Sequence, residues 1–204
     1  RDWSSDVCSS DLNHGVEAWM YDISDPRVRV ITPGVDVDFF KGWVGGDKKP
    51  MTVIADFINR DAFCGYSLWR RVTNGIDVNL WGNTAGLSKP TTDKHHLLSL
   101  YQNASVYFNP TLRASFGFVI IEAMAVGCPI VSTKNGPLPE MVIDGYNGYC
   151  SNDEDYLRTK ILEIINNPDL ARELGENGRT MAINVFNRRK FIDKWSQLLL
   201  EVVK

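Results

Sequence analysis

Residues 109–131 read NPTLRASFGFVIIEAMAVGCPIV, and this stretch says more about the fold than any other part of the chain. The four residues before it, 105–108, are a short apolar run that stops at an Asn-Pro dipeptide, as a strand does where it enters a loop. Residues 118–126 predict a helix, because they are apolar and are followed by a glycine in the C′ position. Residues 129–131 predict the next strand. Strand, loop, helix and strand in this order indicate a unit of parallel sheet.

The same alternation extends to both sides of this unit. Short loops between alternating strands and helices predict an α/β fold, in which a Rossmann-like parallel sheet is covered by helices on both faces. Further strands are expected at 28–31, 51–55 and 77–81, and further helices at 66–72, 93–102 and 137–143.

The C-terminal segment is predicted to be all helical, with helices at 153–166, 168–184 and 188–203. The last helix has one apolar stripe, so we expect it to pack against something, and its partner to lie in a part of the protein that is missing. The stripe consists of Phe191, Ile192, Trp195, Leu198, Leu199 and Val202.

Composition excludes several classes of protein. The 204 residues are 44% hydrophobic and 23% charged, with a net charge of -3, so nothing points to a collagen, a disordered chain or a nucleic-acid partner. No apolar run reaches the length of a membrane span. The histidines at 14, 95 and 96 lack metal-ligand spacing, and Cys64, Cys128 and Cys150 are expected to be reduced thiols.

The loop before residue 118 is the best candidate for a ligand site. In a doubly wound sheet it lies at the carboxyl edge, where ligands bind. Ser115 and Gly117 let the backbone approach a ligand, and free amides at the helix start suit a diphosphate. Glu122 is a carboxylate inside an apolar helix, so it needs a partner. A ribose diol and a neighbouring loop amide both fit that requirement.

Several motifs, taken in order, resemble a known family. The chain over 16–203 is similar to the C-terminal, donor-binding half of the retaining, GT4-like glycosyltransferases (glycosyl transferases group 1), which have the GT-B fold. The resemblance rests on Thr32-Pro-Gly-Val-Asp36, on the segment 116–131, on Asn135-Gly-Pro-Leu-Pro-Glu140 and on the helix of 186–195. Each motif is weak alone, but their common order and spacing make the resemblance specific.

The resemblance also divides the chain. Residues 1–12 have no periodicity and look like a translated sequencing adapter, although a genuine polar tail is the alternative. If they are an adapter, the protein is truncated at its N-terminus. We expect residues 13–40 to be a remnant of the interdomain linker, 41–185 to be the nucleotide-sugar-binding domain, and 186–204 to be the C-terminal crossover helix.

The resemblance assigns roles to matching residues. It implies that Glu122 binds the donor ribose and that the backbone of Gly117, Phe118 and Val119, beside Ser115, holds the diphosphate. Arg60 is offset by one residue from the family's arginine and is expected to stabilise the diphosphate charge as the catalytic residue. Asn83 follows a strand and faces either the donor or only the loop edge.

Two positions depart from the family pattern. Ala114 stands where the family has a glutamate that touches the transferred sugar, and Cys64 stands at the position of a diphosphate-binding lysine. Arg70, Arg71 and Arg113 are possible substitutes for that lysine, although solvated surface arginines are the more common case.

The activity that the resemblance implies is transfer of a sugar from a UDP- or GDP-type donor to an acceptor hydroxyl, with retention and without a metal or other cofactor. The acceptor is a glycan, a lipid or a small molecule, and its site belongs to the missing N-terminal domain, so the fragment alone is expected to be inactive. The expected location is cytoplasmic, with peripheral membrane association of the full enzyme allowed. A degenerate, non-catalytic nucleotide-binding or partner domain is the second hypothesis, and a GT-B sugar-nucleotide epimerase is the third.

Overall fold

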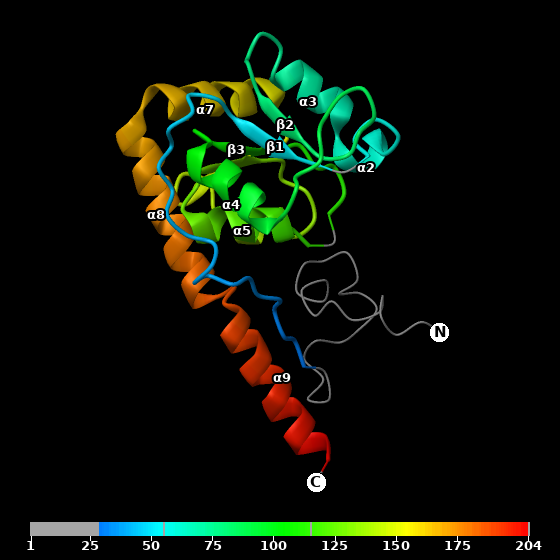
Figure 1. Cartoon of the computed structure of the whole chain (residues 1–204), viewed down its shortest axis with the longest axis vertical. Coiled ribbons are helices and arrows are strands. Elements are labelled where there is room, and N and C mark those ends of the chain that lie inside the picture. The colour runs from blue at the N-terminus through cyan, green and yellow to red at the C-terminus, as the bar shows by residue number, and fades with distance from the viewer. Residues whose placement is uncertain (1–28, 55, 115, 204) are drawn as a thin grey trace.

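The computed structural model describes residues 29–54, 56–114 and 116–203 (Figure 1). The predictions for residues 1–12, His14 and Ser115 lie outside these ranges, as does the first part of the expected linker. Within the described ranges no helix is both long enough and apolar enough to cross a membrane.

A single parallel sheet forms the centre of the fold, as predicted. Its strands pair in the order β2-β1-β3-β4-β5, and every pairing is parallel. In this order β1 lies beside β3. After β1 the chain forms β2 at one edge of the sheet, and it then crosses back over β1 to form β3. The strands are β1 Met51–Val53, β2 Asn79–Trp81, β3 Tyr107–Asn109, β4 Ile130–Ser132 and β5 Gly148–Cys150.

Helices cover both faces of this sheet (Figure 1). Successive strand residues point to opposite faces. Tyr107 and Ile130 therefore pack in one apolar cluster with α4 and α5, while Phe108 and Val131 pack in a second cluster with α3 and α7. The helices are α2 Asp61–Cys64, α3 Tyr66–Val72, α4 Lys94–Asn103, α5 Phe118–Val126, α6 Leu138–Met141, α7 Glu154–Asn166, α8 Pro168–Asn184 and α9 Arg188–Val202.

Helix α8 lies against the C-terminal end of α5 through two glycines. A Cβ atom added to Gly175 of α8 would lie 2.0 Å from the carbonyl oxygen of Gly127, which is the αL cap of α5. Arg179, one turn further along α8, donates hydrogen bonds to the carbonyl oxygens of Phe40, Ala125 and Val37. Helix α8 therefore fixes the position of α5 with respect to the segment that precedes β1.

The segment that enters the α/β unit is paired with the segment that leaves it. The Val35 amide donates to the Phe186 carbonyl at 2.7 Å, and the Arg188 amide donates to the Val35 carbonyl at 2.9 Å. Arg188 also forms a 3.0 Å ion pair with Asp36. Both crossing segments are thus joined at one place, beside the start of α9.

Helix α9 extends away from the α/β unit (Figure 1), and none of its residues is buried. Part of its predicted apolar stripe is open to solvent in the described chain, since Leu199 is 58% exposed and Val202 is 75% exposed. The described residues therefore leave part of this stripe uncovered.

Three sequence predictions were wrong or incomplete. The strand expected at 28–31 does not form over its described residues, 29–31, because the backbone there pairs with no sheet strand and the first bridge, at Val35, is to Asn187. Strand β5 and the short helix α2 were not predicted.

Candidate functional site

The carboxyl ends of β1 and β3 define the position that this fold offers to a ligand. The chain connections diverge between these two strands, and ligands of doubly wound sheets bind at such a switch point. The loops that follow β1 and β3, at 54–60 and 110–117, therefore supply the candidate site.

Helix α2, which directly follows the first loop, is hydrogen-bonded to the second loop. The Phe63 carbonyl of α2 accepts from the amides of Leu112 and Arg113 at 2.7 and 3.1 Å. Gly65 ends α2 with φ +75°, and a Cβ atom there would lie 2.1 Å from the Pro110 carbonyl oxygen. Only glycine allows this approach, so the sequence at Gly65 fixes the loop after β1 against the loop after β3.

Helix α5 begins at the second loop without a side-chain cap. Gly117 is its N-cap, and the Gly117 carbonyl accepts from the Ile120 and Ile121 amides at 3.0 and 3.1 Å. The Phe118 and Val119 amides lie at the first two positions of the helix, so they have no acceptor within it. Together with the positive end of the helix dipole, they are suited to an anion.

Glu122 lies one turn into α5 and is half-buried. Its Oε2 accepts a hydrogen bond of 3.2 Å from the hydroxyl of Tyr101 on α4. Burial raises the pKa of the Glu122 carboxyl above its ordinary value, while the Tyr101 hydrogen bond and the charge of Lys94 act in the opposite direction. The neighbouring loop amide that we considered as a partner is thus replaced by a tyrosine from another helix.

Arg60 is the N-cap residue of α2, directly after the β1 loop. Its carbonyl accepts from the Phe63 and Cys64 amides, and its side chain is exposed. Burial raises the pKa of the nearby Cys64 thiol, and the Arg60 charge acts in the opposite direction. No carboxylate among the described residues forms an ion pair with Arg60, so its guanidinium is free to meet an anion.

The other arginines considered as substitutes differ in their surroundings. Arg71 is held by Glu154 through a 2.7 Å ion pair, and Arg70 lies 5.8 Å from the centre of the Tyr66 ring. Arg113 is in the loop after β3, with its guanidinium 5.3 Å from the centre of the Phe63 ring. Of these three, only Arg113 lies in a loop of the candidate site.

Asn83 and Thr84, after β2, hold the β1 loop in place. The Asn83 Oδ1 accepts from the Asp56 amide at 3.0 Å, and the Thr84 hydroxyl accepts from the Phe57 amide at 2.7 Å. Asp56 has a positive φ of 49°, which the Asn83 contact helps to maintain. Donor binding by Asn83 stays a prediction.

The two histidines of α4 pack against aromatic side chains. His95 packs against Phe39 and His96 against Trp81, with ring centroids 5.1 and 4.9 Å apart. Throughout the part of the chain that the structure describes, no three His, Cys, Asp or Glu side chains come together as a metal site would require.

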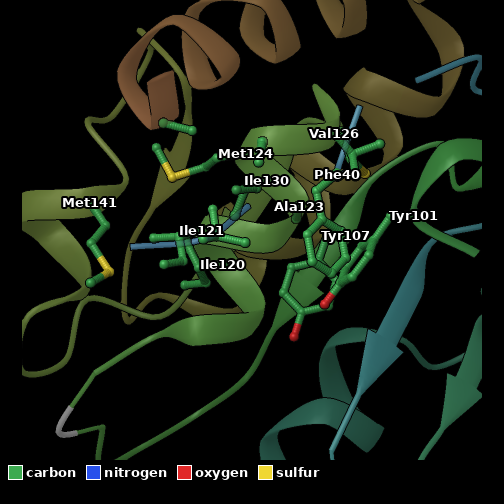
Figure 2. Packing of buried hydrophobic residues seen from close by; sticks show 14 of the residues in the cluster. Phe40, Tyr101, Tyr107, Ile120, Ile121, Ala123, Met124, Val126, Ile130 and Met141 are labelled. Atoms are coloured by element: carbon green, nitrogen blue, oxygen red, sulfur yellow. The ribbon is translucent and has the colours of Figure 1, made fainter. Parts of the chain in front are cut away.

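Tyr101 and Tyr107 were not predicted from the sequence. Their ring centroids lie 5.7 Å apart in the core (Figure 2), and the Tyr101 hydroxyl donates to Glu122. The sequence places Lys94 and Tyr101 two helical turns apart on one face of α4, but it gives no signal that this face meets Glu122.

Comparison with known proteins identifies the domain. Residues 89–181 match the family model of glycosyl transferases group 1. An uncharacterized glycosyltransferase of Methanocaldococcus jannaschii is 33% identical over 139 residues, which are 67% of this chain and 37% of that protein. The MMP alpha-(1->4)-mannosyltransferase of Mycolicibacterium hassiacum is 38% identical over 96 residues, 45% of this chain and 23% of that protein. The chain thus spans well under half the length of these relatives.

Solved structures agree on the fold. Sucrose-phosphate synthase from Thermosynechococcus elongatus superimposes with a TM-score of 0.74 at 21% identity, over 92% of this chain and 55% of that one. HepE from Anabaena, solved with UDP-glucose, gives 0.68 at 16% identity, over 85% and 57%. The matched family, the parallel sheet and these superpositions lead to one conclusion: residues 89–181 form a group 1 glycosyltransferase domain, and the chain has the fold of the C-terminal domain of the GT-B glycosyltransferases.

Proposed function

We propose that this chain is the donor-binding half of a retaining glycosyltransferase that takes a sugar from a UDP- or GDP-type donor. The proposal rests on the carboxyl edge of the sheet, where the segments that follow β1 and β3 are joined by hydrogen bonds. There the uncapped start of α5, the exposed Arg60 and the half-buried Glu122 come from two adjoining strand–helix units. HepE, which was solved with UDP-glucose, has the same fold and supports a nucleotide sugar as the ligand.

In the proposed reaction, the acceptor hydroxyl oxygen bonds to the anomeric carbon, and the bond from that carbon to the diphosphate breaks. The nucleoside diphosphate leaves with the electron pair of that bond, and its leaving oxygen takes up the proton of the acceptor hydroxyl. The Arg60 guanidinium and the Phe118 and Val119 amides stabilise its growing negative charge. Glu122 anchors the ribose hydroxyls, which keeps the diphosphate in line with the helix start. This arrangement uses no metal ion or other cofactor.

The acceptor is a glycan, a lipid or a small molecule, and its site belongs to an N-terminal domain outside this chain. We therefore expect residues 13–204 to bind the donor without transferring its sugar. We place the full enzyme in the cytoplasm, where nucleotide sugars are available, with membrane association only at the surface.

Thermal shift measurements with UDP, GDP and ADP test the donor assignment. A nucleotide at 100 times its dissociation constant stabilises the folded chain by about 2.7 kcal/mol, which is a rise in Tm of roughly 5–10 °C. Glu122→Gln should reduce this shift, because it replaces a charged acceptor of the ribose hydroxyls. Glu173→Gln, at an exposed position of α8, is the matched control. No shift with any of the three nucleotides in the unaltered chain would contradict the proposal.

A further inference from the structure

The hydroxyl of Tyr101 is placed between two acceptors on α5. It lies 3.2 Å from the Val119 carbonyl oxygen and 3.2 Å from Oε2 of Glu122. A tyrosine has one proton to donate. The Val119 carbonyl belongs to the first turn of α5 and accepts from the helix amide four residues on, so the Glu122 carboxylate is the acceptor that needs this proton.

Tyr101 itself cannot turn away from Glu122. Its side chain is fully buried, with ring centroids 6.4 Å from Phe40 and 5.7 Å from Tyr107 (Figure 2). A side chain locked by packing on all sides presents its hydroxyl in a fixed position. The carboxylate that binds it therefore has a fixed position too.

Tyr107 offers a contrast from the same cluster. It is also fully buried and packs on the Tyr101 ring, yet its hydroxyl has no hydrogen-bond partner in the described chain. The charged and titratable groups that face Glu122 are therefore Tyr101 and Lys94 from α4 and Tyr107 from β3. Among the two tyrosines, only Tyr101 holds the carboxylate directly.

We propose that Tyr101 is a positioning residue for the donor: its hydroxyl holds Oε2 of Glu122 so that Oε1 is aimed at the ribose hydroxyls of the nucleotide. This inference rests on the proposed function, since it takes Glu122 as the ribose ligand. It adds that discrimination between ribose and deoxyribose depends on a residue that never touches the nucleotide.

The hydrogen bond also sets the protonation of Glu122. Burial raises the pKa of this carboxyl, and the Tyr101 hydroxyl and Lys94 lower it. Without the tyrosine hydroxyl, the pKa of Glu122 rises further, and the carboxylate is lost at a higher pH. Nucleotide binding that needs the ionised carboxylate should then fail earlier on acidification.

Calorimetric titration of the 204-residue chain tests the inference, with whichever of UDP, GDP and ADP the unaltered chain binds. Tyr101→Phe should weaken binding of the ribonucleotide about 2- to 10-fold, the value of one hydrogen bond. It should raise the pH at which binding is lost on acidification. It should also reduce the difference in affinity between the ribonucleotide and its 2′-deoxy analogue. Tyr107→Phe removes a hydroxyl of the same kind without a hydrogen bond, and should leave these properties unchanged.

The outcomes separate the two proposals. If the unaltered chain binds none of the three nucleotides, the proposed function fails and the role of Tyr101 fails with it. If that chain binds a nucleotide and Tyr101→Phe keeps its affinity, the pH at which binding is lost and its discrimination against deoxyribose, only the positioning role is overturned. Titration of the Glu122 carboxyl by carbon-13 NMR is the second measurement, because it needs no ligand. An unchanged pKa in Tyr101→Phe would also overturn the inference.

Discussion

Alanine substitutions at two glycines of α8 should change stability in opposite directions. Gly175 and Gly178 are both buried in the interior of this helix, and alanine is favoured over glycine there by about 1 kcal/mol. The difference lies in what the new methyl group meets. At Gly178 the nearest atoms are 3.8 Å away, an ordinary contact, whereas at Gly175 the Gly127 carbonyl oxygen is 2.0 Å away.

The magnitudes follow from these distances. Gly178→Ala keeps the helix gain, so the free energy of unfolding should rise by about 1 kcal/mol and Tm by roughly 2–4 °C. Gly175→Ala forces α8 away from the end of α5 by about 1 Å, because backbone atoms cannot yield as a side chain does. Overpacking of this kind costs up to about 3 kcal/mol. The net loss is then about 2 kcal/mol, or roughly 4–8 °C in Tm.

Thermal and urea unfolding of both variants beside the unaltered chain measures the effect. The expected gap between the two variants is roughly 6–12 °C. A gain in stability at Gly175 equal to that at Gly178 would refute the close approach of α8 to Gly127. Helix α8 would then no longer account for the fixed position of α5.

Four further changes test other contacts. Glu122→Gln should remove a pH dependence of the free energy of unfolding, because the folded chain holds the Glu122 proton more tightly than the unfolded chain does. The stability from this group is present below the ordinary glutamate pKa of about 4.3 and is lost as the pH rises through the raised pKa of the folded chain. Urea titrations between pH 4 and 7 measure this loss. Arg179→Met should lower the free energy of unfolding by about 1–3 kcal/mol, because three carbonyl groups lose a charged donor, and the same titrations measure it. Gly65→Ala should lower Tm and weaken nucleotide binding in calorimetry, since its Cβ would overlap the Pro110 carbonyl. The exposed pair of Arg71 and Glu154 should contribute under about 1 kcal/mol in a double-mutant cycle, and a larger coupling would contradict its exposed placement.

The sequence was sufficient to predict the parts of the fold that local chemistry controls. Helix α5 has a run of apolar residues and a glycine at its C′ position, so its bounds at Phe118 and Val126 were predicted correctly. Strand β5 was not predicted, because three residues that begin with a glycine have no strand pattern of their own. They become a strand only through pairing with β4.

The candidate site also has parts that the local sequence predicts and parts that depend on contacts between distant segments. The uncapped start of α5 follows from the strand–loop–helix order and could be predicted. The partner of Glu122 could not, because Tyr101 is 21 positions away along the chain and meets it only where α4 packs on α5. Tethering of the β1 loop by Asn83 likewise depends on a contact between separate strands.

The paired crossing at Val35 and Asn187 has a consequence for engineering. The chain enters and leaves the α/β unit at neighbouring points. The unit therefore behaves as an inserted domain, with its first and last residues side by side. Such an insert can be exchanged as one cassette, by cutting on the outer side of the bridge at 34 and 188. Grafts made there keep the bridge partners inside the exchanged piece. A cut between 40 and 50 would separate Arg179 from the Phe40 and Val37 carbonyls that it holds.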